Sequence, residues 1–193
     1  TFKTTKKTLQ IGDANGKLVP NGKHYFDRMG EGEIIPDAPV FDSFFLQSFD
    51  KKIYWEWRLQ DVHGFTVEYP TGGNWYISTR FKELLEQFKI AKDYYFYPTK
   101  LLYKGEKLDY WIFQYAGSYG ALNKSHYIDF EKSTFIIEDS TKEIKISSYQ
   151  EYLNNDENLF FKRLILNEKV DFIPLNSMSS DKIVSEKLKN AIE

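Results

Sequence analysis

The feature of the sequence that most limits its possible folds is a stretch that is apolar or aromatic on both faces. Within residues 108–115, Tyr110 and Ile112 alternate with Trp111 and Phe113. Successive side chains of a β-strand point to opposite faces, so a strand with one face in water has a polar residue at every second position. The lack of that pattern predicts a central strand that is covered on both sides.

The preceding stretch is the predicted partner of this strand. Residues 93–103 are also rich in aromatic side chains, and residues 104–107 between the two stretches contain Gly105 in a charged segment typical of a turn. The pair therefore predicts a β-hairpin. Pro98 has no backbone N–H, which predicts an edge position or a bulge for the first strand of the hairpin.

A helical period precedes the hairpin. Phe81, Leu84, Leu85 and Phe88 recur at i, i+3, i+4 and i+7, which is typical of the core-facing stripe of a helix, and Ser78 is placed to cap its N-terminus. The other predicted elements are strands at residues 53–59, 65–69, 127–130, 135–138, 143–146, 160–166 and 170–173, a helix at 148–153, and a last helix that begins near 179–185 and runs to the chain end.

The helical segment has a second, similar copy. Residues 77–86 and 184–193 share Ser, Lys and Glu at three positions and keep the chemical class at five more. In the same register Phe65 aligns with Phe172, which predicts that each helix follows a strand after the same loop length. The alternative is that any capped amphipathic helix after a strand would align this well.

The predicted fold class is α+β, with a mainly antiparallel twisted sheet, two similar strand–loop–helix units and few helices. One domain is expected over residues 1–193. Glycine and proline punctuate residues 1–50, which predicts an irregular N-terminal part with one or two short strands. The first copy of the unit spans residues 65–88 and the second spans residues 172–193. The second copy has no counterpart of the last residues of the first, so we expect the chain to be truncated after Glu193.

Composition restricts the classes of partner. The chain has 193 residues and a formal net charge of −2, whereas nucleic-acid-binding proteins usually carry a basic excess, so no nucleic-acid partner is predicted. It contains no Cys, which excludes disulfides and thiolate catalysis and fits a cytoplasmic location. It has no apolar run of 18 residues, so no membrane span is predicted. An oligomeric state is not assigned.

Motifs of catalysis and metal binding are not found. His24, His63 and His126 lie far apart in the sequence without a metal-ligand spacing, so they are interpreted as surface or hydrogen-bonded structural histidines. A GxSxG motif, a P-loop and a dinucleotide fingerprint do not occur. We therefore predict no catalytic residue, no cofactor and no metal.

Two other function classes remain open. Carboxylate pairs, Asp129 with Glu131 and Glu138 with Asp139, are compatible with an unrecognised carboxylate hydrolase, although solvated strand edges explain them equally well. The high aromatic content is compatible with a small-ligand or glycan-binding domain, with stacking residues such as Tyr54, Trp75 and Tyr119.

The candidate binding surface is an acidic stretch that contains phenylalanines. Residues 29–50 hold five acidic residues and no basic one. Carboxylates around aromatic anchors suit a basic protein partner, and the candidate partner-binding residues are Asp37, Phe41, Asp42 and Phe44. The alternative is a solvated loop whose phenylalanines cover the core.

Five motifs of the chain resemble those of one bacterial family. They are YISTRFKELLE at residues 76–86, YFYPTKL at 95–101, YWIF at 110–113, YIDFEKS at 127–133 and IVSEKL at 183–188. Over residues 60–193 this pattern resembles the immunity proteins of polymorphic toxin systems, a group formerly catalogued as a domain of unknown function. The resemblance implies a non-catalytic protein that binds a cognate toxin and neutralises it by occlusion. Residues 1–60 have no counterpart in the resemblance.

Overall fold

The computed structural model describes residues 11–47, 58–66, 74–117, 122–138, 140, 142–175 and 182–193. Over these ranges the chain has 11 β-strands and 4 α-helices with mostly antiparallel pairing, which confirms the mixed α+β class with few helices. None of the described helices is long and apolar enough to cross a membrane.

The contacts of the chain divide into two compact units. Unit 1 comprises residues 1–88 and 92–122, and unit 2 comprises residues 89–91 and 123–193. Each unit has its own cluster of buried apolar side chains. The expectation of one domain over the whole chain stays a prediction.

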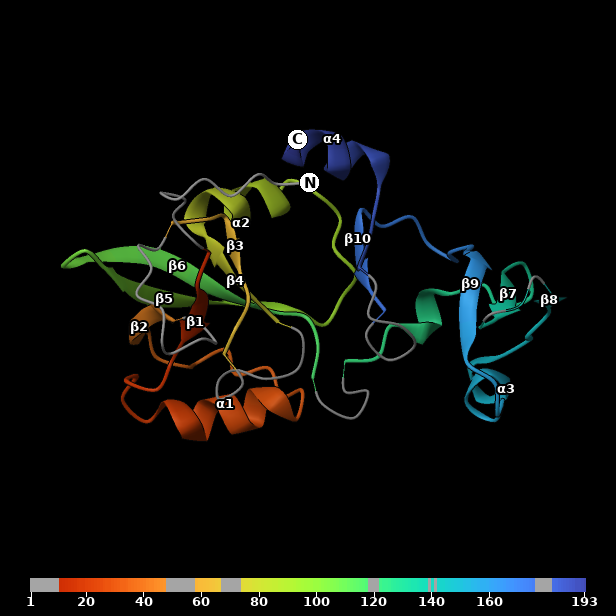
Figure 1. Ribbon diagram of the computed structural model, residues 1–193, viewed down its shortest axis with the longest axis horizontal. Helices are drawn as coiled ribbons and strands as arrows, with labels where there is room; N and C mark the ends of the chain where they lie inside the picture. The colour runs from red at the N-terminus through yellow and green to blue at the C-terminus, as the bar shows by residue number, and fades with distance from the viewer. Residues whose placement is uncertain are drawn as a thin grey trace. The chain divides into compact units, whose positions relative to one another are not determined.

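Unit 1 is built on a six-stranded sheet (Figure 1). Its strand order is β1 (Asp13–Asn15), β2 (Phe41–Gln47), β5 (Tyr95–Tyr103), β6 (Glu106–Gln114), β4 (Trp75–Ser78) and β3 (Val62–His63), and its helices are α1 (Gly22–Gly30) and α2 (Thr79–Leu85). Neighbouring strands are antiparallel except for β2 and β5, which are parallel.

The two ends of this strand order meet. The Ala14 N–H donates to the Gly64 carbonyl oxygen at 2.8 Å, and the Thr66 N–H donates to the Ala14 carbonyl oxygen at 3.0 Å. These bonds form a parallel bridge between Ala14 and Phe65, which joins β1 to the segment that follows β3. The sheet therefore closes on itself.

The predicted burial of residues 108–115 on both faces is confirmed by β6. This strand lies between β5 and β4, and Ile112 packs in the same buried cluster as Phe26 and Met29 of α1. On the other face, the Trp111 Nε1 donates to the Thr79 hydroxyl of α2 at 3.1 Å. Figure 1 shows α1 and α2 on opposite sides of the sheet. Both faces of β6 are thus covered from Tyr110 onward, whereas Asp109 is exposed.

The hairpin is confirmed, but the predicted place of its first strand is wrong. β5 and β6 pair along their length around Lys104 and Gly105, whose φ angles of 50° and 87° suit a tight two-residue turn. β5 is an internal strand because it also pairs with β2. Pro98 is tolerated there because the ladder with β2 begins at Thr99, and the extra residue of the register shift lies in β2.

The N-terminal part contains a helix that was not predicted. Helix α1 begins after Asn21, which has a left-handed φ of 54°, and it buries Phe26 and Met29 to exposed fractions of 2% and 0%. The strands β1 and β2 match the one or two short strands predicted there. The helix has only nine residues, so its apolar period is too short to stand out among the neighbouring glycines and prolines.

Unit 2 contains two small sheets and two short helices. Its elements are a sheet in the order β8 (Glu143–Ile144), β7 (Thr134–Ile137) and β9 (Leu159–Arg163), a pair of β10 (Phe172–Pro174) and β11 (Lys182–Val184), and the helices α3 (Tyr149–Leu153) and α4 (Glu186–Ile192). Phe135 and Ile173 lie at the centre of its core. The strand predicted at 127–130 is instead a 3₁₀ turn, Ser125–Tyr127, followed by a single bridge between Ile128 and Leu166.

Two helices begin with the same hydrogen bonds. The Ser78 hydroxyl accepts from the Phe81 N–H at 3.1 Å and caps α2 as predicted. The Ser185 hydroxyl accepts from the Leu188 N–H at 3.1 Å and caps α4. Each serine hydroxyl also donates to an aspartate earlier in the chain, at 2.6 Å in unit 1 and 2.7 Å in unit 2.

The loops before these two helices differ in length. The residue before the serine of α2 pairs with Val62, and the residue before the serine of α4 pairs with Phe172. The capping serine and its aspartate are 17 residues apart in unit 1 and 14 apart in unit 2. The ungapped alignment of Phe65 with Phe172 is therefore wrong. Most of the predicted strand at 53–59, and residues 67–69 of the next, lie outside the described residues.

Candidate functional site

Two of the four predicted partner-binding residues lie in the core of unit 1. Phe41 and Phe44 have exposed fractions of 1% and 0%. The ring of Phe41 packs at 6.1 Å from that of Tyr97, and the ring of Phe44 packs at 4.9 Å from that of Tyr76. Both phenylalanines therefore cover the core, as in the alternative interpretation, because the extra residue of β2 between them brings both side chains to the inner face.

The two aspartates of the predicted set lie at the surface. Asp37 is exposed. Asp42 forms an ion pair with Lys107 at 2.5 Å, and this hydrogen bond is the main cause that lowers the pKa of the Asp42 carboxyl. A partner that binds Asp42 must compete with Lys107, whereas Asp37 has no such ion pair among the described residues.

Asp37 belongs to an exposed segment between α1 and β2, residues 31–40, which we call the acidic loop. It contains three carboxylates and no basic residue. Val40, at its end, has an exposed fraction of 53%. The carboxylate of Glu33 pairs with the guanidinium of Arg28 on α1, and this hydrogen bond is the main cause that lowers the pKa of Glu33. The loop thus presents negative charge beside apolar surface.

The sheet of unit 1 holds the acidic loop by its backbone. The side chain of Gln114, which has an exposed fraction of 0%, donates to the carbonyl oxygens of Met29 and Glu33, both at 3.0 Å. The Gln114 Oε1 accepts from the Tyr97 hydroxyl at 2.7 Å, and that hydroxyl accepts from the Ile35 N–H at 2.9 Å. Burial raises the pKa of Tyr97 to about 12, so its hydroxyl stays a neutral donor at neutral pH.

Pattern analysis of the sequence did not find this network. Its one signal is Gln114, a polar residue directly after the apolar run 110–113 of β6. A buried amide has four hydrogen-bonding positions to satisfy, so a glutamine within a central strand indicates a structural partner nearby. The identity of that partner depends on how residues 81 and 85 positions apart come together.

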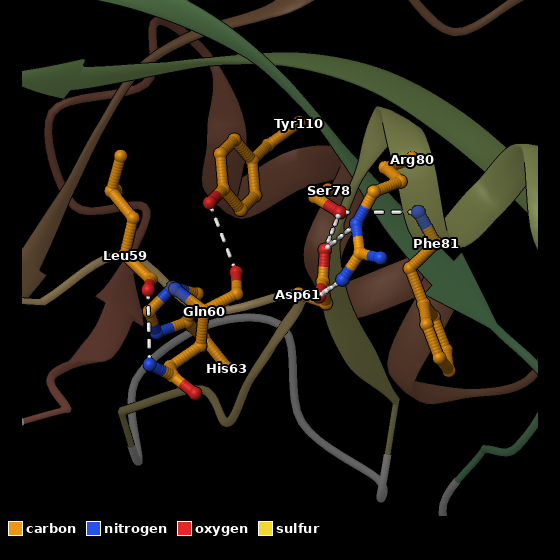
Figure 2. Close-up of polar contacts among 8 residues, drawn as sticks. All are labelled: Leu59, Gln60, Asp61, His63, Ser78, Arg80, Phe81 and Tyr110. Atoms are coloured by element: carbon orange, nitrogen blue, oxygen red, sulfur yellow. Dashed lines mark hydrogen bonds and ion pairs between the residues drawn. The ribbon is translucent and has the colours of Figure 1, made fainter. Parts of the chain in front are cut away.

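A second polar cluster lies where β3, β4 and α2 meet (Figure 2). The Asp61 carboxylate accepts from the Ser78 hydroxyl and from the guanidinium of Arg80. Burial acts to raise the pKa of Asp61, but the hydrogen bonds from Arg80 and Ser78 together outweigh it and lower the pKa. A carboxylate with a lowered pKa is a weak general base, so this serine is not activated as a nucleophile. The cluster caps and anchors α2.

His63 lies beside this cluster with both ring nitrogens occupied. Its exposed fraction is 1%. Nδ1 lies 2.8 Å from the Gly12 carbonyl oxygen, and Nε2 accepts from the Gln60 N–H at 3.1 Å. A carbonyl oxygen only accepts and a backbone N–H only donates, so the proton is on Nδ1 and the ring is neutral. Burial is the main cause that lowers the pKa of His63. His63 is thus a hydrogen-bonded structural histidine.

Unit 2 contains an open cavity of about 450 Å³, with the lining residues Lys89, Leu164, Ile165, Leu166, Glu168, Lys169, Val170, Asp171 and Ser185. Glu168 forms an ion pair with Lys89. Asp171 accepts from the Lys89 N–H and from the Ser185 hydroxyl, and these bonds lower the pKa of its carboxyl. An acid catalyst needs a raised pKa, so Asp171 gives no support to a carboxylate hydrolase.

One carboxylate of each predicted pair has a structural partner. Asp129 accepts from the Lys132 ammonium at 2.6 Å, and Glu138 accepts from the Asn158 amide at 2.6 Å. Glu131 is exposed, and Asp139 lies outside the described residues.

The aromatic residues proposed for ligand stacking are not grouped in the described part of the chain. Trp75 is half-buried, with its ring 6.3 Å from that of Phe113 and 5.4 Å from that of Tyr115. Tyr54 and Tyr119 lie outside the described residues. Trp75 therefore gives no support to a stacking site.

Neither a metal-ligand group in the described part of the chain nor a similar known protein points to a further site. Among the described residues, no group of three or more His, Cys, Asp or Glu side chains could hold a metal ion. The sequence matches no protein-family model, and neither a curated protein nor a solved structure matches it. The resemblance to the immunity proteins therefore stays a prediction from the motifs.

Proposed function

We propose that this protein is a non-catalytic binding protein of the immunity type, which binds a cognate bacterial toxin and neutralises it by occlusion. The observation that supports this proposal is the acidic loop. Its three carboxylate side chains are exposed, while its backbone is held by buried hydrogen bonds with Gln114 and Tyr97. A loop that is ordered before binding loses less conformational entropy in the complex, and binding residues concentrate on loops held by a rigid scaffold.

The partner that suits this loop is a toxin domain with a basic surface. Asp37 is its proposed direct contact, and Asp42 is a second contact whose bond to Lys107 must be exchanged on binding. Complementary charge at an exposed rim acts mainly on the association rate, and it weakens as salt is added. Neutralisation then follows from covering the active surface of the toxin.

The state of the other polar groups agrees with a role in binding. Asp61 and Ser78 bond to each other, and both ring nitrogens of His63 bond to backbone groups. A catalytic site needs a base whose pKa is near the working pH and that faces a substrate. These three side chains serve the fold instead.

The test is co-expression with the toxin encoded by the adjacent upstream gene, followed by a toxicity assay and a pull-down. The double variant Glu31→Lys, Asp37→Lys reverses the charge of the loop without touching its buried anchors. We expect it to slow association by roughly tenfold or more at low salt and to weaken rescue. The matched control is the double variant Glu83→Lys, Glu106→Lys, which makes the same change of charge at two exposed carboxylates of unit 1 outside the loop and should bind as the wild type does.

Two results would count against the proposal. If the wild-type protein forms no complex and gives no rescue, the immunity function is wrong. If the control variant Glu83→Lys, Glu106→Lys weakens binding as much as Glu31→Lys, Asp37→Lys does, net charge rather than the acidic loop governs association.

We also propose that residues 61–88 and 171–193 are two copies of one strand–loop–helix unit. Four features support this proposal. In both segments an aspartate accepts from a capping serine, that serine donates its backbone N–H to the aspartate carbonyl oxygen, and the residues next to them pair in the same antiparallel register. The third helical residue after each serine, Phe81 or Leu188, is buried.

A further inference from the structure

The three-stranded sheet of unit 2 has an open edge. Among the described strands β9 pairs only with β7, so it ends the order β8, β7, β9 (Figure 1). The opposite edge of this sheet, β8, has only two residues, and the sheet of unit 1 closes on itself. With five residues, β9 is the longest edge strand in the described part of the chain. An edge strand carries unpaired N–H and C=O groups that can bond to a further strand.

The pairing with β7 determines which backbone groups of β9 face outward. Glu138, the residue after β7, donates its N–H to the carbonyl oxygen of Asn158, the residue before β9, at 2.9 Å. In an antiparallel ladder, residues that bond to the neighbouring strand alternate with residues whose N–H and C=O point away from it. Leu159 and Phe161 therefore present their backbone groups on the open side. The extra residue of β9, Lys162, lies beyond them.

The side chain between these two residues is an exposed aromatic ring. Phe160 has an exposed fraction of 45% and makes no ring contact with another described aromatic residue. Its neighbours pack in the core of unit 2, where Leu159 is 8% exposed and the ring of Phe161 lies 4.8 Å from that of Phe135. β9 thus combines unpaired backbone groups with an uncovered apolar side chain, which is the composition of a strand that pairs with another chain.

The charges at the two ends of β9 favour one direction of pairing with a second copy. Glu157 precedes the strand and Arg163 ends it, and both are exposed without an ion pair to any described residue. Lys162, by contrast, already pairs with Glu143 of β8. If two copies of β9 ran parallel in register, each end would meet the same charge, which is destabilising. If they run antiparallel, the acidic end of each copy lies beside the basic end of the other.

We propose that β9 is a self-association edge, at which two copies of the chain pair antiparallel about a two-fold axis at Phe160. In this register the outward N–H and C=O of Leu159 bond to those of Phe161 in the second copy, and the same bonds repeat across the axis. The two Phe160 side chains then meet on one face of a continuous sheet. The proposal does not rest on the proposed binding function, because the acidic loop belongs to unit 1.

The test is sedimentation equilibrium of the whole chain. A contact of about five residues from each copy buries less than the roughly 1,200 Å² of a stable complex, so a weak dimer is expected. A monomer–dimer equilibrium should therefore appear between about 10 μM and 1 mM. Phe160→Lys places two ammonium groups at the axis and should raise the dissociation constant by about tenfold or more. The matched control is Leu153→Lys, at an exposed apolar residue of α3 in the same unit, which should leave the dissociation constant unchanged.

A charge exchange tests the direction of pairing. Glu157→Lys and Arg163→Glu each replace two attractive contacts of the dimer with two repulsive ones, so each should raise the dissociation constant by about threefold or more. The double variant restores opposite charges and should recover the affinity of the wild type.

A measurement on the wild type tests the alternation of the backbone groups. In hydrogen exchange at rising protein concentration, the amides of Leu159 and Phe161 should gain protection. The amide of Phe160 faces β7 and should be protected at every concentration.

Three results would overturn the proposal. The first is a wild-type chain that stays monomeric at about 1 mM. The second is a dimer that Leu153→Lys weakens as much as Phe160→Lys does. The third is a dimer whose formation leaves the amides of Leu159 and Phe161 unprotected, because another surface then joins the two copies.

Discussion

The helices α2 and α4 begin alike and end differently. Each has a serine cap that bonds to an aspartate, and one turn later each buries an apolar side chain, Phe81 in α2 and Leu188 in α4. Four residues further along, Leu85 of α2 has an exposed fraction of 0%, whereas Ile192 of α4 has one of 47%. The same N-terminal chemistry therefore starts helices whose second turns have different surroundings.

The difference lies in the sheet that each helix can cover. Helix α2 lies against the broad sheet of unit 1, where the Lys82 ammonium stands 4.6 Å from the ring centre of Trp111 and 5.5 Å from that of Phe96. Helix α4 follows β11, which pairs only with β10 among the described strands. Capping decides where a helix begins, whereas the burial of its apolar stripe depends on the area of the neighbouring layer.

The largest expected effect tests this difference in burial. Leu85→Ala removes a fully buried side chain and should lower the free energy of unfolding by about 2–5 kcal/mol. Ile192→Ala removes a half-exposed side chain and should cost less than about 1 kcal/mol. Chemical denaturation of both variants measures the two costs. Equal costs would break the comparison, because they would mean that α4 buries its second turn as α2 does.

An intermediate effect tests what the helices share. Ser78→Ala and Ser185→Ala each remove a cap and a bond to an aspartate, so each should lower the free energy of unfolding by about 0.5–2 kcal/mol. Ser78→Thr and Ser185→Thr retain a hydroxyl and should lose less. Thermal unfolding followed by circular dichroism gives the ranking. If only one alanine variant is destabilised, the two caps are not equivalent and the proposed repeat loses its main support.

The smallest expected effect is the pH dependence of the two caps. The bonds that Asp61 and Asp171 accept lower the pKa of both carboxyls below the ordinary value of 3.8. Each carboxylate therefore stabilises the folded state fully above pH 3.8, and this stabilisation is lost as the pH falls through the lowered pKa. Solvent screens both groups, so the loss should be small and should shrink further in high salt.

Unfolding between about pH 5 and pH 2 measures this effect. Asp61→Asn and Asp171→Asn should each flatten the dependence of the free energy of unfolding on pH by a similar amount. Asp156 is an exposed carboxylate after α3, and Asp156→Asn should leave this dependence unchanged. If only Asp61→Asn flattens this dependence, the two aspartates do not stabilise their caps equally.

Patterns in the sequence predicted the elements whose signals are local. The two-sided apolar pattern of residues 108–115 predicted a central strand, Gly105 marked the hairpin turn, and Ser78 marked the start of a helix. These signals act over a few residues, through side-chain alternation, backbone freedom and capping, so they hold wherever the segment lies in the fold.

Tertiary structure decided the features that depend on distant partners. Phe41 and Phe44 cover the core, and Pro98 is accepted in an internal strand, because of how β2 pairs with β5. The anchoring of the acidic loop by Gln114 and the neutral state of His63 also come from residues far apart in the chain. A buried polar group can be recognised from the sequence as needing partners, but which groups satisfy it is set only when the chain has folded.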